Sequence, residues 1–297
     1  MKKTWRRILS AMILAVMIWA GAIAPLPGAG AEVFLNQEKP ADWEERDLLR
    51  ITALSFIQND AFVLECGGEV MLLDGGSALR GDDLHQFLAE HDMLHVKMIF
   101  NSHPHDDHIE ALYLNIKNSG LTADEFISPF PADYKLKGDY QRKMVSLLEE
   151  KGIPFRQMLP GEQLQLGGTV MTLYRAEKGD TNATSGVLMI RFGKASILMT
   201  GDISGEAEKL IMADVGEEAL KADILKAPHH GIMRMVSAFL TAVSPELGIV
   251  TSRKDTKAQE QFENKKIPCI WTSLGDTVLE TDGTDWYVNQ ENKWVKK

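Results

Sequence analysis

Three histidines and two aspartates fall within six residues, from His103 to His108, and no other feature restricts the possible folds of the chain as strongly. The segment 101–108 reads Asn-Ser-His-Pro-His-Asp-Asp-His and follows an apolar run, 96–100, that predicts a buried strand. A solvated polar loop is the alternative interpretation, but loops rarely collect so many metal-binding side chains. We therefore interpret the segment as part of a metal site.

The spacing of these side chains predicts how they are arranged. His103 and His105 have the period of residues on one face of a strand, and Pro104 favours an extended backbone between them. Asp107 and His108 follow where the chain turns into a predicted helix. The four side chains should converge just beyond a strand end, with the nitrogen and oxygen donors that zinc and related divalent metals accept.

Three other apolar segments also end in acids or imidazoles. Each is more often a turn or a surface feature when it occurs alone. In a chain that already contains a metal-binding motif, the three together favour a shared site. They are Asp74 after 69–73, Asp202 after 196–199, and the pair His229 and His230 after 224–226.

Strand and helix patterns occur in two successive series, each of which opens with strands and then alternates with helices. The first series has strands at 48–56, 61–66, 69–73, 96–100 and 125–128, and helices at 82–90, 109–117 and 139–151. The second has strands at 169–174, 187–191, 196–199, 224–226 and 247–250, helices at 204–215, 234–243 and 257–264, and closing strands near 270 and 278. This order predicts an α/β protein, a four-layer αβ/βα sandwich of two mixed sheets with helices outside.

The N-terminus has the pattern of a secretory signal peptide. Lys and Arg side chains precede an apolar run at 8–24, and Ala29-Gly30-Ala31 offers a cleavage site. An uncleaved anchor is the alternative, although it would need about 20 apolar residues. We expect residues 1–31 to be removed and residues 32–297 to form one domain, secreted or extracytoplasmic and without membrane attachment.

The charge of the mature chain limits its partners. The predicted signal peptide removes four basic side chains and no acidic one, which leaves 28 basic against 42 acidic residues and a formal charge of −14. Such a surface repels polyanions at long range unless basic residues gather around one groove. Long nucleic acid is therefore disfavoured as a substrate.

The chain has two cysteines, Cys66 and Cys269. An exported protein could join them in a disulfide, but both fall in apolar strand-like runs where a buried free thiol is equally ordinary. Their spacing does not distinguish the two states.

The ordered motifs resemble those of the metallo-β-lactamase superfamily. They are Asp74, His-x-His-x-Asp-His at 103–108, Thr-Gly-Asp at 200–202 and His-His-Gly at 229–231. Leu-Asp-Gly-Gly at 73–76, Asn-Ala-Thr-Ser at 182–185 and Leu-Lys-Ala-Pro-His-His-Gly at 225–231 are more narrowly similar to the extracellular hydrolase domain of ComEC-type proteins and to related secreted hydrolases.

The resemblance implies roles for these residues. His103 and His105 would hold one metal, Asp107 and His108 would help hold a second, and Asp202 would bridge them. One of His229 and His230 would complete the second site, the other facing substrate. Asp74 and Asn182 would lie behind the ligands, and Asp107, Asp202 and His230 would act in catalysis. Two divalent metal ions are implied, with zinc favoured and manganese the alternative.

The chain departs from the family pattern beside the expected site. The loop near Asn182 lacks the histidine found elsewhere in the superfamily, as is usual in the ComEC-like branch. Gln-Asn-Asp-Ala at 58–61 and Glu-Ala at 110–111 replace glycine-rich segments, and Thr-Ser-Arg-Lys-Asp at 251–255 replaces a stretch that often contacts substrate. In this last stretch Arg253 or Lys254 could bind an anion, although exposed basic residues are usually only solvated.

These observations predict an exported metal-dependent hydrolase that cleaves a phosphodiester or related small ester with a metal-bridging hydroxide. Hydrolysis of a lactone or β-lactam is an alternative, as is a DNA-processing nuclease related to competence. A cell-envelope binding module with a decayed site is the non-enzymatic alternative. A small ester, with a phosphate group, is the expected partner.

Overall fold

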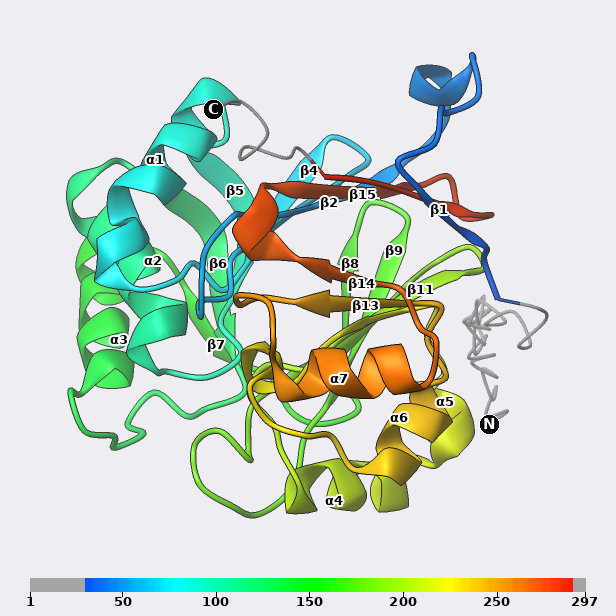
Figure 1. The fold of residues 1–297 in the computed structure, drawn as a ribbon. Coiled ribbons are helices and arrows are strands. Elements are labelled where there is room, and N and C mark those ends of the chain that lie inside the picture. The colour runs from blue at the N-terminus through cyan, green and yellow to red at the C-terminus, as the bar shows by residue number, and fades with distance from the viewer. Residues whose placement is uncertain (1–29, 291–297) are drawn as a thin grey trace, which may run out of the picture.

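The computed structural model describes residues 30–290, which form two facing β-sheets with helices on both outer faces (Figure 1). The predicted α/β four-layer sandwich is therefore confirmed.

The first sheet has nine strands and is built mainly from the first half of the chain. Its strands in spatial order are β1 (Val33–Leu35), β16 (Trp286–Gln290), β15 (Thr277–Thr281), β2 (Leu49–Ala53), β3 (Phe62–Cys66), β4 (Glu69–Leu73), β5 (His95–Phe100), β6 (Thr122–Ser128) and β7 (Phe155–Gln157). The β2–β3–β4 strands form an antiparallel meander, and β4 to β7 run parallel.

The second sheet has seven strands. Their spatial order is β14 (Cys269–Trp271), β13 (Leu247–Val250), β12 (Ile224–Lys226), β11 (Ala195–Met199), β10 (Val187–Phe192), β9 (Thr169–Tyr174) and β8 (Gln163–Leu166). The β8 to β11 strands are antiparallel, and β11 to β14 run parallel.

The helices form two outer layers. The first sheet is covered by α1 (Gly81–Glu90), α2 (Asp106–Asn118) and α3 (Tyr140–Lys151), and the second by α4 (Glu206–Val215), α5 (Glu217–Leu220), α6 (Ser237–Val243) and α7 (Lys257–Asn264). Short 3₁₀ turns lie at Trp43–Glu45, Ala78–Arg80, His229–Gly231 and Thr272–Leu274. Buried apolar side chains form three clusters, one between the sheets and one beneath each helix layer.

The parallel strands bring the predicted site residues to one edge of the sandwich. Chain segments leaving β4 and β5 in the first sheet, and β11, β12 and β13 in the second, all begin at the carboxyl ends of parallel strands. Ligands collect at such ends because loops there can present side chains without interrupting the sheet.

Several predicted boundaries were wrong. The helix expected from residue 109 begins at Asp106, and the helix expected from residue 234 begins only at Ser237. The structure also has β1, β7, β8, β16 and α5, which the sequence patterns did not predict. These elements are three to five residues long, too short for periodicity to show, and their pairing partners decide their conformation.

The predicted signal segment lies outside the described residues except for Gly30 and Ala31. Ala31 is buried, and its backbone N–H donates to Asp223 Oδ1 at 3.1 Å. Removal of the segment therefore stays a prediction. Among residues 30–290, no helix combines the length and apolar character needed to span a bilayer.

Cys66 and Cys269 are both free thiols. Cys66 ends β3 of the first sheet and Cys269 begins β14 of the second, and burial raises the pKa of the Cys269 thiol to about 12. Of the two states that the sequence left open, a disulfide or two free thiols, the structure has the free thiols.

A buried carboxylate joins two helix ends in the second outer layer. Glu208 Oε1 accepts from Gly205 N–H at 3.3 Å at the start of α4, and Oε2 accepts from Val236 N–H at 2.5 Å at the start of α6. Burial raises the pKa of Glu208 from 4.5 to about 7. The folded protein therefore holds this proton more tightly than the unfolded chain does.

This difference predicts a pH-dependent stability. The stabilisation by protonated Glu208 is complete below about pH 4.5 and is lost as the pH rises through about 7. In urea unfolding, the free energy of unfolding of the wild type minus that of Glu208→Gln should fall by up to about 3 kcal/mol between pH 5 and 8. The same difference for Glu206→Gln, an exposed acid in the same helix turn, should stay constant. Equal differences at both pH values for Glu208→Gln would refute the assignment.

Candidate metal centre

The loop after β5 places His103 and His105 against each other. His103 is fully buried, and His105 is the extended residue before α2, with φ −83° and ψ 157°. His103 Nε2 lies 3.1 Å from His105 Nδ1, so two ring nitrogens face one point. Asp107 and His108 occupy the first turn of α2 rather than the loop before it, because the helix begins earlier than predicted.

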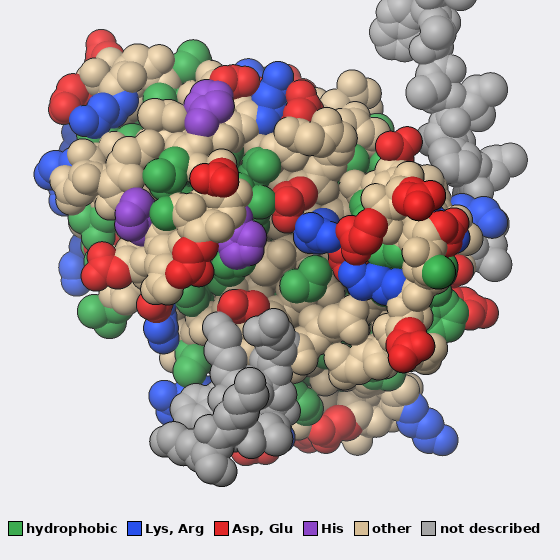
Figure 2. All heavy atoms as spheres, turned by 90° about the horizontal axis from the view of Figure 1, so that it is seen from above, with side chains coloured by type: hydrophobic (Ala, Val, Ile, Leu, Met, Phe, Trp, Pro, Cys, Tyr) green, Lys and Arg blue, Asp and Glu red, His purple; other side chains and the backbone are tan. Residues whose placement is uncertain are grey.

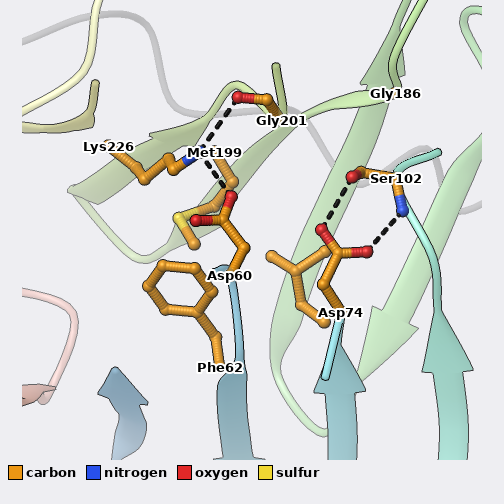
Figure 3. A pocket seen from close by; sticks show the side chains of 9 residues that line it. Asp60, Phe62, Asp74, Ser102, Gly186, Met199, Gly201 and Lys226 are labelled. Carbon is orange, nitrogen blue, oxygen red and sulfur yellow. Dashed lines mark hydrogen bonds and ion pairs between the residues drawn. The ribbon is translucent and has the colours of Figure 1, made fainter. Parts of the chain in front are cut away.

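Asp74 holds His108 from behind. Its carboxylate accepts from the Ser102 N–H and Oγ, both at 2.7 Å (Figure 3). It also accepts from Asn101 Nδ2 at 2.8 Å. Its Oδ2 also lies 2.8 Å from His108 Nδ1. A carboxylate at Nδ1 fixes the tautomer and ring orientation and leaves Nε2 as the free donor atom, as at metal-binding histidines.

Asp202 is the point at which the two halves of the fold meet. It follows β11 after Gly201, whose φ is +50°. Its Oδ1 lies 3.3 Å from His108 Nε2, and its Oδ2 lies 3.3 Å from His230 Nε2 and 3.9 Å from His103 Nε2. Its carboxylate therefore faces imidazoles from both halves of the chain.

The His229–His230 pair divides into an inner and an outer side chain. His230 is buried, and its Nε2 lies 3.2 Å from Asp107 Oδ2. His229 has a 26% exposed side chain, and its Nε2 lies 3.7 Å from Asp202 Oδ2. Both residues have positive φ, 49° and 53°, a conformation that costs energy in non-glycine residues and often marks functional turns. Of the two alternatives, the structure places His230 with Asp107 and His108, and His229 at the opening.

Asn182 does not reach this group through any hydrogen bond in the described residues. Its side-chain oxygen is buried without a hydrogen-bond partner there. Ser185, three residues later, is the member of the loop that contacts the site, since its Oγ accepts from Asp202 N–H at 3.4 Å.

A buried ion pair that the sequence patterns did not predict lies beside the centre. Lys226, with a side chain 1% exposed, forms an ion pair with the buried Asp60 and donates to Gly201 O at 2.9 Å (Figure 3). Asp60 Oδ1 also accepts from Thr251 Oγ1 at 2.6 Å and lies 3.2 Å from His230 Nδ1. Lysine is almost never fully buried without a partner, so a lysine at the end of an apolar strand, as at Lys226, indicates a buried acidic partner.

The charges of the centre depend on one another. Burial opposes ionisation of Asp202, but His108 and His230 outweigh it and hold the pKa of Asp202 well below 3.8. Burial likewise opposes ionisation of Asp60, but Lys226 and then His230 lower its pKa. Burial, followed by the charge of His108, lowers the pKa of His103 well below 6.5, which favours a neutral imidazole. Burial opposes the charged forms of His108 and His230, but Asp202 outweighs it and raises the pKa of His108 well above 6.5 and that of His230 to about 10. Because metals bind ionised carboxylates and neutral imidazoles, these two rings would each release a proton when a metal binds.

The donor set fits divalent cations. His108 Nε2 and Asp202 Oδ1 are buried and have no hydrogen-bond partner in the described part of the chain, although they face each other. Asp60, His108, Asp202 and His230 each place one donor atom within 4.8 Å of all the others. The oxygens of Asp60 already serve Lys226, Thr251 and His230, so we assign Asp60 to orienting His230 rather than to a metal.

The donor atoms form two groups, which are candidate metal positions. The first metal position would have donors from His103, His105 and Asp202. The second metal position would have donors from Asp107, His108, His230 and the shared Asp202. These are imidazole and carboxylate groups that suit zinc and harder divalent ions alike.

Comparisons with known proteins agree with the sequence resemblance. Residues 54–249 match the model of the Metallo-beta-lactamase superfamily. ComE operon protein 3 of Bacillus subtilis is 23% identical over 200 residues, 66% of this chain and 25% of that protein. Recombination protein 2 of Haemophilus influenzae is 26% identical over 212 residues, 68% of this chain and 24% of that protein. The chain thus spans about a quarter of the length of these relatives.

A solved structure shows the same fold. The metallo-beta-lactamase fold protein YhfI from Bacillus subtilis superposes with a TM-score of 0.53 at 15% identity, covering 80% of this chain and 100% of that one. The match covers the whole of that protein and four fifths of this chain, which agrees with the sandwich fold.

The position of Asp202 predicts a separation between folding and metal binding. A neutral amide in Asp202→Asn lacks the charge and the second equivalent oxygen of the carboxylate that faces His103, His108 and His230. The variant should therefore fold but retain less than a tenth of the wild-type bound metal after dialysis. Asp223→Asn, a buried carboxylate outside the centre, should retain the wild-type metal content. Full metal content in a folded Asp202→Asn protein would show that Asp202 is only a turn residue.

Removal of the Asp60 carboxylate should have two separable effects, one on stability and one on metal binding. Asp60→Asn should lower the free energy of unfolding by about 3–5 kcal/mol because it leaves a buried ammonium without a counterion. It should also weaken metal binding about 10- to 100-fold because His230 loses its carboxylate.

The double variant Asp60→Asn with Lys226→Met distinguishes the two. It should regain much of the stability, since no uncompensated charge remains, while metal affinity measured against a chelator stays low. Wild-type affinity in the double variant would mean that Asp60 does not orient His230.

Proposed function

The chain belongs to the metallo-β-lactamase superfamily, and from this premise we propose that it is an exported metal-dependent phosphodiesterase acting on a small ester. One observation supports hydrolysis above all. Asp202 stands between two groups of metal donors, and the fold buries all of these except part of His105 and Asp107. Two adjacent cations, held by loops at the carboxyl ends of the strands, would suit phosphoester cleavage.

The chain's own residues prepare the centre for this reaction. Divalent cations bound there would lower the pKa of a water molecule and offset the charge that develops on the attacked and leaving oxygens. Asp74 and Asp60 hold His108 and His230 through Nδ1, so neither ring has to reorient when substrate binds.

Substrate can reach His229 and Asp107, because their side chains are 26% and 31% exposed, and His105 is partly exposed as well. Burial lowers the pKa of His229, which favours a neutral imidazole in the free protein. A neutral His229 can accept a hydrogen bond from water or donate one to a phosphoryl oxygen. We assign His229 to the substrate side, and His230 to the second metal position.

Zinc is the proposed metal and manganese the alternative. Imidazole donors favour zinc, whereas the carboxylates of Asp107 and Asp202 and the absence of a histidine near Asn182 leave room for the harder ion. Two ions are proposed because the Asp202 carboxylate faces both donor groups, with Oδ2 3.9 Å from His103 Nε2 in the first and Oδ1 3.3 Å from His108 Nε2 in the second.

The net charge supports a small substrate. On the face shown in Figure 2, the upper side of the molecule in Figure 1, acidic side chains are interspersed with basic ones. With a formal charge of −14 for residues 32–297, a polyanion is repelled at long range, while a small ester responds mainly to the local field of the centre.

Other substrates remain as alternatives to be tested. The name of Recombination protein 2 supports a DNA-processing role as the second candidate. Hydrolysis of a lactone or β-lactam is another alternative, in which the same water would attack a carbonyl carbon. The non-enzymatic alternative is a cell-envelope binding module whose metal site has decayed, and such a module would bind no stoichiometric metal. We propose secretion from the N-terminal pattern alone.

The substrate-size proposal predicts a kinetic difference. With zinc or manganese present, kcat/KM for bis(p-nitrophenyl) phosphate should change less than about threefold between 50 and 200 mM salt, and should exceed kcat/KM for single-stranded or duplex DNA. A DNA substrate held by several basic contacts would instead lose affinity steeply with salt. Efficient DNA cleavage with a steep salt slope would replace the small-ester proposal by the nuclease alternative.

A further inference from the structure

A cavity of about 410 Å³ lies beside the metal centre, at the loop between β13 and α7. Its volume falls within the range of pockets that hold small organic ligands. The eight residues that line it include three basic side chains, Arg253, Lys254 and Lys257, and one acidic side chain, Asp255. None of these residues belongs to either metal position.

Three wall residues place the cavity next to the centre. Gln58 lies two residues before Asp60, Ile232 two residues after His230, and Ser252 directly after Thr251. The two loops are joined, since Gln58 N–H donates to Thr251 O at 2.9 Å. Consecutive Cα atoms are about 3.8 Å apart. The wall of the cavity is therefore within two residues of Asp60, His230 and Thr251.

The cavity has an excess of positive charge. Arg253 and Lys257 form no ion pair with any residue of the described part of the chain, and Lys254 Nζ lies 5.2 Å from the centre of the Trp271 ring. All three side chains are exposed. In a chain with net negative charge, three cations within five residues around one cavity produce a local field that attracts anions.

The backbone adds to this field. Thr256, which also lines the cavity, is the residue before α7, and its Oγ1 accepts from Gln259 N–H at 3.3 Å. The amino end of α7 therefore borders the cavity, and helix amino ends favour negative charge. Lys257 is the first residue of this helix.

We propose that this cavity binds a second anionic group, a phosphate carried on one arm of the phosphodiester that the metal centre cleaves. The inference rests on the proposed function and specifies its substrate class. A phosphate suits the cavity because Arg253 offers several N–H donors and the two lysines add charge without a fixed geometry. A cationic arm is disfavoured by the same three side chains.

The experiment compares two substrates that differ only in the second phosphate: thymidine 5′-(p-nitrophenyl phosphate), with and without a 3′-phosphate. The wild type should cleave the 3′-phosphorylated ester with a kcat/KM about 10-fold higher, mainly through a lower KM. Arg253→Gln with Lys257→Gln should abolish this preference and leave kcat/KM for the simpler ester unchanged.

Lys265→Gln with Lys266→Gln is the matched control. It removes the same charge from the other end of α7, and should keep the preference if the cavity and not the net charge is responsible. Loss of the preference in the control, or its persistence in the Arg253 and Lys257 variant, would overturn the assignment while phosphodiester hydrolysis stands.

A binding measurement separates the two proposals. If neither ester is cleaved, the proposed function fails. Calorimetric titration with thymidine 3′,5′-bisphosphate and with thymidine 5′-monophosphate then tests whether the cavity binds a second phosphate. At least 10-fold tighter binding of the bisphosphate, lost in the Arg253 and Lys257 variant, would support the site. Equal affinities for the two nucleotides would refute it.

Discussion

The buried ion pair between Asp60 and Lys226 is the interaction on which the arrangement of the centre depends. Asp60 belongs to the loop between β2 and β3 of the first sheet, and Lys226 ends β12 of the second. The same ammonium binds the carbonyl of Gly201, so it positions the turn that presents Asp202. Two charges in a nearly dry environment are costly to bury, and this one pair holds the edges of both sheets where the donors converge.

The same arrangement, a carboxylate that holds a histidine ring at Nδ1, occurs twice in the centre. Asp74 binds Nδ1 of His108, and Asp60 binds Nδ1 of His230, so both rings present Nε2 to Asp202. Because each carboxylate is itself held by hydrogen-bond donors, the two imidazoles have little freedom to turn. Rigid support of this kind lets a short loop such as 229–231 carry functional side chains despite its positive φ angles.

Burial divides the site into a rigid interior and an accessible rim. His103, His108, Asp202 and His230 are almost inaccessible to solvent, whereas Asp107 and His229 are partly exposed. The cavity at the β13–α7 loop lies beside this site, since its wall includes Gln58 and Ile232, which are two residues from Asp60 and His230. Its basic side chains are exposed on a loop, where side chains are free to contact a substrate.

The sequence by itself determined the fold class and the ligand types. Strand and helix periods follow from local burial, and the segment 101–108 contains its own spacing, so neither required knowledge of distant contacts. The sequence did not show the short strands β1, β7, β8 and β16, the contact between Asp60 and His230, or which of His229 and His230 is the buried side chain. Each of these depends on contacts across long sequence separations, 170 residues between Asp60 and His230. Only the tertiary structure could decide them, because whether a carboxylate orients a histidine, binds a metal or caps a turn depends on what the rest of the chain brings within about 3 Å of it.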